Sequence, residues 1–462
     1  MNADIINHVS QIESKLRLDS VTIQSINEAL DNNIDQAKEL LNNLHFADIA
    51  DLIDNATLEH KRKIIEIISV SITPEAIALI IKELDTSVME QVIPMLGEAC
   101  AQIFALMEID DAIHVLEHLP EAKQNKIISL LPQEKRYAIR EGLSYPENTA
   151  GRIMNCDLIS IGADWTIAKT IDFLRSNSSV PFDFYEIYVV DDNLHPIGSI
   201  LVSRVIKSPE TEVISTLMNK DIHTVSPFTD QEEVGYLFRQ YGLVSAPVID
   251  RDGKLIGMIT IDEIVDVIEE EAEEDIMRLA GVNEIDLHAA VLHTVKHRFP
   301  WLFINLLTAC MTSFVIDMFH DTIHQMVTLA AIMPIVASMG GNAGTQTLAV
   351  IVRAIANRDL NMVNNSRIIF KQVFSNCLNG LFLAILGGAI LLLWSHDFHL
   401  SLIFALAVII NFTMAGFLGA FIPLTLSRIG IDPATASGVF LTALTDIIGF
   451  VAFLGLARYF LI

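Results

Sequence analysis

Five long apolar stretches follow Arg298 and predict membrane-spanning helices. They cover roughly residues 299–320, 324–352, 372–395, 400–427 and 435–460. Each is long enough to cross ~30 Å of hydrocarbon as a helix. The second is unusual, because MGGNAGTQT at 339–347 places three glycines, two amides and two threonines in its middle. Such a segment packs closely against other helices, breaks locally, or lines a polar path.

Residues 20–142 show a different pattern, in which Leu and Ile recur at i, i+3 and i+4 over short segments. This spacing predicts amphipathic helices of about 10–19 residues. Asp, Thr or Pro in the short connectors are typical helix starts. Helices of this kind in series predict a stacked α-helical superhelix, with a compact bundle as the alternative, since no strict repeat length is visible.

Residues 154–270 contain an internal duplication. The segment MNCDLISIGADWTIAKTIDFL resembles MNKDIHTVSPFTDQEEVGYLF, 64 positions on, and IYVVDDNLHPIGSI resembles APVIDRDGKLIGMI, 59 positions on. Each copy is expected to form a strand, a helix, a strand, a hairpin turn, a strand and a helix, with Asp252–Gly253 as a strong hairpin signal. Neither copy buries its sheet alone, so the two should pack as a pseudo-twofold pair.

Composition divides the chain into an acidic half and a membrane half. Of the 462 residues, 52% are hydrophobic, and the net charge is −27. Residues 296–462 carry eight basic and six acidic groups, whereas residues 1–295 carry 22 basic and 51 acidic groups. Such an acidic body repels nucleic acid and attracts cations, although acidity that serves only solubility is the simpler reading.

Charges in the predicted loops orient the spans. Lys and Arg precede the first span and lie between the second and third, including Arg353 and Arg358, and between the fourth and fifth, at Arg428. The opposite loops, HDTIH and SHDFHLS, have neither residue type. The positive-inside rule therefore predicts a cytoplasmic N-terminal body and a C-terminus outside the inner (plasma) membrane. No signal peptide is expected, and four unpaired cysteines fit a reducing compartment.

An acidic segment, TIDEIVDVIEEEAEEDIMRLAGV, joins the acidic half to the first span. Its acids include Glu263, Asp266, Glu269, Glu270, Glu271, Glu273, Glu274 and Asp275. On a helix, residues 266, 270, 273 and 274 share one face, with 263 one turn earlier. Oxygen ligands in this number suit Mg²⁺ or Ca²⁺, and the position favours metal sensing. A solvated charged helix is the alternative, and the spacing does not match an EF-hand loop.

Two acids of the fifth span are candidate ion ligands. Asp446 lies in mid-span, where a lone carboxylate costs ~2.5–3.5 kcal/mol and by default marks an ion route. Asp432, in GIDPAT, is equally well explained as a helix cap. We expect MGGNAGTQT, with Asn342 and Gln346, to line a pore opposite Asp446 or to serve helix contact.

Several motifs together resemble the MgtE family of magnesium channels. They are YPENTAGRIM, DVIEEEAEEDIMRLAGV, PIVASMGGNAGTQTLAVIVRAIANRDL and GIDPATASGVFLTALTDIIGF, in the order of the family. The duplication between them resembles a tandem pair of CBS domains, a module that often binds adenine nucleotides. With the helical segment, the resemblance spans almost the whole chain.

The resemblance implies a homodimer with five spans per subunit and a pore along the dimer axis. It places the pore aspartate at Asp446, with the Thr442 backbone nearby, and a second acid at Asp432. It also implies that cytoplasmic Mg²⁺ is sensed by the side chains of Glu263, Asp266, Glu271, Glu274 and Asp275. The family often has Asn-Pro or Gly-Pro where this chain has Gly438–Val439, which bears on the start of span 5.

The CBS resemblance also implies a ribose site, formed by a Thr after the last strand and an Asp three residues on. The second copy has Thr260, but Glu263 stands at the Asp position; the first copy has Leu201 and Arg204 there. ATP as a regulatory ligand through Thr260 is therefore only one possibility, with a purely structural CBS pair as the other.

These arguments predict a multidomain chain. It consists of an α-helical superhelical N-domain (1–144), an α/β tandem CBS pair (145–270), an acidic connecting helix region (271–297) and a five-helix transmembrane pore domain (298–462). The predicted function is a Mg²⁺ channel gated by cytoplasmic Mg²⁺. The alternatives are a channel for Co²⁺ or Mn²⁺, and a membrane-anchored nucleotide sensor without transport. An enzyme is not expected, because the histidines are scattered and no nucleophile–base pair or phosphate loop is present.

Overall fold

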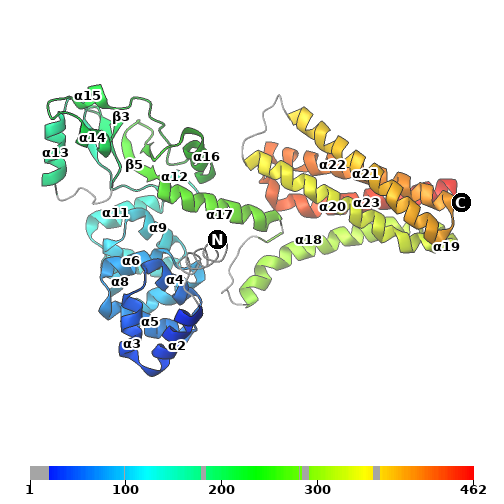
Figure 1. The fold of residues 1–462 in the computed structure, drawn as a ribbon, viewed down its shortest axis with the longest axis horizontal. Coiled ribbons are helices and arrows are strands. Elements are labelled where there is room, and N and C mark those ends of the chain that lie inside the picture. The colour runs from blue at the N-terminus through cyan, green and yellow to red at the C-terminus, as the bar shows by residue number, and fades with distance from the viewer. Residues whose placement is uncertain are drawn as a thin grey trace, which may run out of the picture. The chain divides into compact units, whose positions relative to one another are not determined.

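The computed structural model describes residues 20–97, 99–177, 184–279, 281–282, 291–356 and 365–461 (Figure 1). The chain forms two compact units, residues 1–269 and 270–462, and each is described by itself. Three predicted features lie outside the described residues: the first 19 residues, residues 283–290 of the connecting region, and the loop charge Arg358.

The first unit begins with a domain of short helices. They are α2 (Ser20–Asn32), α3 (Ile34–Asn42), α4 (Phe46–Asp54), α5 (Leu58–Ser71), α6 (Pro74–Lys82), α7 (Thr86–Val92), the 3₁₀ helix η1 (Ile93–Leu96), α8 (Ala99–Leu106), α9 (Ile109–Glu117), α10 (Glu121–Leu130) and α11 (Gln133–Gly142). Alternate helices pack in succession, α4 on α6, α6 on α8 and α8 on α10. One hydrophobic core runs from Ile26 to Ile139, so the helical N-domain predicted from periodicity is confirmed.

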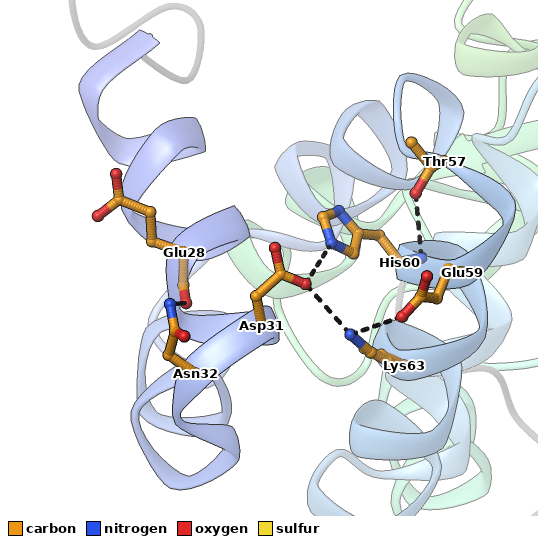
Figure 2. A network of polar contacts seen from close by, with 7 residues as sticks. All are labelled: Glu28, Asp31, Asn32, Thr57, Glu59, His60 and Lys63. Atoms are coloured by element: carbon orange, nitrogen blue, oxygen red, sulfur yellow. Dashed lines mark hydrogen bonds and ion pairs between the residues drawn. The ribbon is translucent and has the colours of Figure 1, made fainter.

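Helix starts in this domain follow the predicted signals. Thr57 and Thr73 accept hydrogen bonds from the third residue of α5 and α6, and Pro74 occupies the first turn of α6. Such caps satisfy backbone N–H groups that have no partner within the helix. Figure 2 shows a polar link between α2 and α5, in which Asp31 accepts from His60 Nε2 (2.9 Å) and Lys63 Nζ (3.2 Å).

The α/β region follows within the same unit. Its elements are α12 (Ala150–Ile153), β1 (Ser160–Gly162), α13 (Ile167–Ser176), β2 (Glu186–Val190), β3 (Pro196–Leu201), α14 (Val202–Lys207), α15 (Ile214–Leu217), α16 (Gln231–Tyr241), β4 (Ser245–Ile249), β5 (Leu255–Thr260) and α17 (Ile261–Leu279), of which residues 270–279 belong to the second unit. Strand β2 pairs parallel with β1 and antiparallel with β3, and β4 pairs antiparallel with β5. In the second copy the strand equivalent to β1 is reduced to a parallel bridge between Val225 and Val248.

The duplication is visible in detail. Both hairpins have a register shift, at Val189/Val190 and Val248/Ile249, which are 59 positions apart as in the sequence match. An aspartate begins each turn, since Asp191 Oδ1 accepts from Asn193 N and Asp250 Oδ1 accepts from Asp252 N, both at 2.9 Å. In the second turn Gly253 adopts φ +83°, a conformation that L side chains disfavour.

The second unit contains the five long apolar helices. They are α18 (Val291–Asp317), α20 (Thr328–Ala356), α21 (Asn365–Ser395), α22 (Phe398–Arg428) and α23 (Pro433–Phe460), with the short helix α19 (His320–Gln325) after α18. All five are long and apolar enough to cross a membrane. Helix α22 packs on α20, α21 and α23, and its buried side chains form the centre of the main hydrophobic core.

Candidate functional site

Helix α20 carries MGGNAGTQT as unbroken α-helix, from Thr328 to Ala356. One face of the segment makes helix contacts. Gly340 lies against Asn411 of α22, Gly344 meets the Leu441 side chain of α23, and the Thr347 hydroxyl accepts a hydrogen bond from Asn376 Nδ2 of α21 (2.8 Å). The glycines of this face therefore serve close approach of helices, and the local break considered from the sequence does not occur.

Asn411 occupies a junction of three helices that the sequence reasoning missed. Its side chain is fully buried, and Nδ2 donates to the Val336 carbonyl of α20 (2.8 Å). Gly340 of α20 and Gly449 of α23 face it, and a Cβ at Gly449 would lie 2.7 Å from its Nδ2. An Asn in the middle of an uncharged apolar span was the available signal, because a buried amide needs a specific partner.

The other face of the motif is exposed in the single chain. Asn342, Thr345 and Gln346 are exposed, whereas Gly341 lies opposite α23, where a Cβ would be 3.9 Å from Thr442 Cγ2. Thr442 is also exposed; its hydroxyl donates to the Gly438 carbonyl (2.9 Å), and its own carbonyl accepts from Thr445 Oγ1 (3.0 Å). The polar groups of α20 and the predicted pore segment of α23 thus belong to neighbouring helices.

Asp446 lies one turn beyond Thr442 on α23. Its side chain is half-buried, and its carboxylate makes no hydrogen bond or ion pair with any other residue that the structure describes. A carboxylate in mid-span that is satisfied inside a packed bundle would be enclosed and hydrogen-bonded. This arrangement leaves it available for water, for an ion, or for a group of a second subunit.

Asp432 caps the first turn of α23 and also contacts the acidic helix. Its Oδ1 accepts from Ala434 N (2.8 Å), with Pro433 at the first helical position, and its Oδ2 accepts from Arg278 Nη1 (2.6 Å). Arg278 simultaneously pairs with Glu274, one turn earlier on α17. The cap interpretation of Asp432 is therefore correct, and the same carboxylate joins the end of α17 to the last membrane helix.

The end of α17 packs at the same place. Leu279 contacts a small core of four buried residues from α20 and α23, and its carbonyl would lie 3.4 Å from a Cβ at Gly438. Beside it, burial and the charges of Asp432 and Glu271 raise the pKa of Asp275 above its usual range, although Arg278 opposes this. The carboxylates of Glu274, Asp275 and Asp432 thus lie near the Arg278 guanidinium, and their mutual repulsion favours an added cation.

The beginning of α17 contacts the helical domain within the first unit. Lys82 Nζ lies 3.1 Å from Glu263 Oε1 and 2.8 Å from Asp111 Oδ1, and the three side chains are 24%, 18% and 11% exposed. Burial raises the pKa of Glu263 to about 7, against the opposing effect of Lys82. Burial lowers the pKa of Lys82, but the two carboxylates outweigh it and leave that pKa above its ordinary value.

The remaining predicted sensing acids are more open. Asp266 and Glu270 are exposed on α17, and Glu271 is half-buried. Burial raises the pKa of Asp266, with Lys82 acting in the opposite direction. Sequence reasoning missed Lys82 and Arg278 as counter-charges: Arg278 follows Glu274 at the i+4 spacing of a helical ion pair, whereas no local signal links Lys82 to Glu263.

A cavity of about 740 Å³ lies between the two CBS copies. Its lining includes Leu201, Arg204 and Lys207 of the first copy and His223 and Tyr241 of the second, whose rings stack at 3.9 Å. Thr260 does not line this cavity. Glu263, three residues on, is paired with Lys82.

Family comparisons match three parts of the chain. Residues 333–456 match the MgtE model described as a divalent cation transporter, and residues 44–148 match the MgtE intracellular N domain. Residues 214–270 match a CBS domain. The three matches follow the order predicted from the sequence.

Whole-chain relatives agree with these matches. A magnesium transporter MgtE of Enterococcus faecalis is 32% identical over 331 residues, 71% of this chain and 72% of its own length. One of Thermus thermophilus is 29% identical over 442 residues, 95% of this chain and 98% of its own length.

Among solved structures, the soluble part of a magnesium transporter is 27% identical, with a TM-score of 0.48, over 54% of this chain and 98% of that one. The cytosolic domain of the Mg²⁺ channel MgtE in complex with ATP is 24% identical, with a TM-score of 0.49, over 53% of this chain and 99% of that one.

Proposed function

The chain belongs to the MgtE family of magnesium transporters, and from that premise we propose that it is a Mg²⁺ channel whose path passes Asp446 and whose closure depends on Mg²⁺ at α17. Membership makes it a multi-pass membrane transporter with a cytosolic N-terminal domain, and not an enzyme. The finer parts of the proposal rest on the contacts described above.

Conduction rests on the half-buried carboxylate of Asp446. Mg²⁺ holds its water tightly and prefers few protein ligands in octahedral geometry. In a homodimer, two copies of Asp446 facing each other would attract the hydrated ion through its waters, with the Thr442 backbone and Asn342 beside them. A complete carboxylate cage would bind the ion too strongly for release. With the C-terminus on the outer side, Mg²⁺ moves inward through the path. Entry into a cell whose interior is electrically negative supplies ~2.3 kcal/mol per charge per 100 mV of membrane potential.

The observation that carries this proposal is the half-buried carboxylate of Asp446 in the middle of a span, which has no hydrogen-bond or ion-pair partner among the residues that the structure describes. Asp446→Asn should abolish Mg²⁺ uptake into liposomes while the purified protein keeps its elution volume. The matched control is Asp317→Asn, an exposed carboxylate at the end of α18, which should keep wild-type uptake. Full residual uptake by Asp446→Asn would remove this residue from the path.

Gating rests on the two ends of α17. We propose that Mg²⁺ joins Glu271, Glu274 and Asp275 near Asp432 at one end of the helix, and Glu263, Asp266 and Glu270 along the rest. At low Mg²⁺ the like charges repel and loosen the contacts that hold α17, which opens the path. At high Mg²⁺ the ion neutralises these carboxylates and the path closes. Cytoplasmic Mg²⁺ thereby limits its own entry.

A charge-neutral double variant tests the gate. Glu271→Gln with Asp275→Asn should weaken the inhibition of uptake by internal Mg²⁺, because two of the proposed ligands lose their charge. Glu273→Gln is the matched control, since Glu273 lies exposed on the same helix. Unchanged inhibition in the double variant would count against gating at this end of α17.

A regulatory nucleotide is a second proposal, favoured by the cavity between the CBS copies. Its stacked rings, His223 and Tyr241, offer a flat surface for a base, and Arg204 and Lys207 offer positive charge for phosphate. Arg204→Gln should weaken ATP binding to the full-length protein, with Lys254→Gln as the control outside the cavity. Nucleotide binding without Mg²⁺ flux would favour the sensor alternative, and ion competition would separate Mg²⁺ from Co²⁺ or Mn²⁺.

A further inference from the structure

Three side chains that can bind a metal meet at the end of α9, one turn beyond Asp111 of the ion-pair cluster with Lys82 and Glu263. His114, Glu117 and His118 occupy i, i+3 and i+4 of the segment HVLEH, so they share one face of the helix. Their ligand atoms all lie within 4.8 Å of one another. The three side chains are partly buried, while their neighbours Val115 and Leu116 belong to the domain core. The cluster is therefore both held in place and reachable from solvent.

The histidine at the helix end is oriented by the backbone. His118 follows the last residue of α9, and its Nδ1 lies 2.8 Å from the His114 carbonyl oxygen. Because a carbonyl only accepts, this contact assigns the proton to Nδ1 and leaves the lone pair of Nε2 free. A histidine that binds a metal through one ring nitrogen usually donates a hydrogen bond from the other. Capping the helix and binding a metal use different nitrogens of the ring.

The carboxylate is oriented from another element. Arg152 of α12 donates through Nη1 to Glu117 Oε2 (3.2 Å), and Arg152 is itself held by a hydrogen bond from Nε to the Tyr145 carbonyl (2.8 Å). The other oxygen, Glu117 Oε1, lies 3.8 Å from His114 Nδ1. One carboxylate oxygen is thus fixed by a guanidinium, while the other faces the histidines.

We propose that His114, Glu117 and His118 bind one divalent transition-metal ion of the Zn²⁺ class. Two imidazole nitrogens and one carboxylate oxygen form a donor set that zinc accepts, with a fourth position left for water. Imidazole suits Zn²⁺, Ni²⁺ or Co²⁺, whereas Mg²⁺ prefers oxygen ligands. The site therefore differs in chemistry from the all-oxygen clusters along α17, and it does not depend on the proposed transport mechanism.

The test is metal binding by the purified full-length protein, with any affinity tag removed and with excess Mg²⁺ present to fill the oxygen sites. Calorimetry with Zn²⁺ gives the number of tight sites per chain, and the visible absorption of Co²⁺ reports nitrogen coordination. The first variant is His114→Ala with His118→Ala. The matched control is His320→Ala with His324→Ala, a second pair at i, i+4, on α19, whose rings lie 6.1 Å apart. The conservative variant Glu117→Gln keeps the size of the side chain.

We expect the His114/His118 variant to bind one Zn²⁺ fewer per chain and to lose the Co²⁺ absorption, while the His320/His324 variant keeps both. Glu117→Gln should weaken Zn²⁺ binding by at least about tenfold, because loss of even an outer-shell partner of a metal ligand costs about 10–100-fold. If the His114/His118 variant does not fold, Glu117→Gln decides alone. Unchanged binding in these variants, or loss of the ion only in the His320/His324 variant, would overturn the proposal.

Discussion

Arg278, one residue before the end of α17, donates through Nη1 to Asp432 Oδ2 at 2.6 Å, and Asp432 is the residue that caps the last membrane helix. The other oxygen of the same carboxylate accepts from Ala434 N at 2.8 Å. The contact ties the end of α17 to the start of α23, about four turns ahead of Asp446. Arg278 contacts Asp432 directly, so no other residue is needed to connect α17 with α23.

Replacing Arg278 with Gln should raise Mg²⁺ uptake when internal Mg²⁺ is low. The guanidinium lies between Glu274 and Asp432, so its loss removes a contact and leaves two carboxylates in repulsion. A partly exposed ion pair contributes ~0.2–1 kcal/mol, so we expect an increase of about 1.4- to fivefold in liposome uptake. Arg278→Lys keeps the charge and should retain most of the wild-type behaviour. Equal uptake by Gln and wild-type protein at low Mg²⁺ would show that this pair does not restrain the channel.

Lys82→Met should make the stability of the cytosolic domain depend on Mg²⁺. The variant leaves Glu263 and Asp111 without their shared cation, and we expect a loss of roughly 1–3 kcal/mol, less than for a fully buried pair because Lys82 is 24% exposed. An ion that binds the folded form restores stability, so added Mg²⁺ should raise the unfolding temperature more than in wild type.

The control for this prediction is Lys63→Met, which removes an exposed pair with Asp31 and Glu59. Thermal unfolding of the full-length protein, with and without Mg²⁺, measures both variants. If Mg²⁺ shifts the unfolding temperature of Lys82→Met no more than that of wild type, Mg²⁺ does not replace the Lys82 ammonium between Glu263 and Asp111.

Much of the fold could be predicted from the sequence, because periodicity and length report burial directly. The spans were found, but α18 begins at Val291 and α21 at Asn365, before the expected 299 and 372. Hydropathy detects only the part of a helix in hydrocarbon, whereas hydrogen bonding continues the helix into water. The CBS hairpins were found because turn chemistry is local.

The site was only partly predictable, because its partners are distant in the chain. Glu263 and Lys82 are separated by 181 residues, and only packing of α17 against the helical domain brings them together. Within α20 the spacing of Gly340, Gly344 and Thr347 already places them on one helical face, which could have favoured packing over a local break. The exposed face with Asn342 could not be assigned from spacing alone.

Asp54 should make the helical domain less stable as pH rises. It lies at the end of α4, where its Oδ1 accepts from Asp85 N (3.1 Å), and burial together with the charge of Asp85 raises its pKa to about 7. The unfolded chain loses this proton at lower pH. The stabilisation is therefore complete below the ordinary pKa and is lost as pH rises through about 7.

Relative to Asp54→Asn, the wild type should lose about 1 kcal/mol of unfolding free energy between pH 6 and pH 8. Asp35→Asn, an exposed carboxylate on α3, is the control and should follow the wild type. Denaturant titrations of the full-length protein at the two pH values measure the difference. Parallel pH dependence in wild type and Asp54→Asn would mean that Asp54 does not titrate in this range.

Gly340→Ala should disrupt the junction of α20, α22 and α23. A Cβ at this position overlaps the side-chain amide of Asn411, which is fully buried and tied to the Val336 carbonyl, so the amide has no room to move without losing its hydrogen bond. Added volume in a packed interior costs ~1–3 kcal/mol, and here a buried amide is displaced as well. Gly455→Ala is the matched control, because outside its own helical turns no atom of a described residue lies within 4 Å of a Cβ there, and Ala favours a helix over Gly. Thermal aggregation in detergent should therefore begin earlier for Gly340→Ala and no earlier for Gly455→Ala. Equal behaviour of the two variants would mean that α20 and α22 can separate at Gly340 without cost, and Asn411 would then not hold the three helices together.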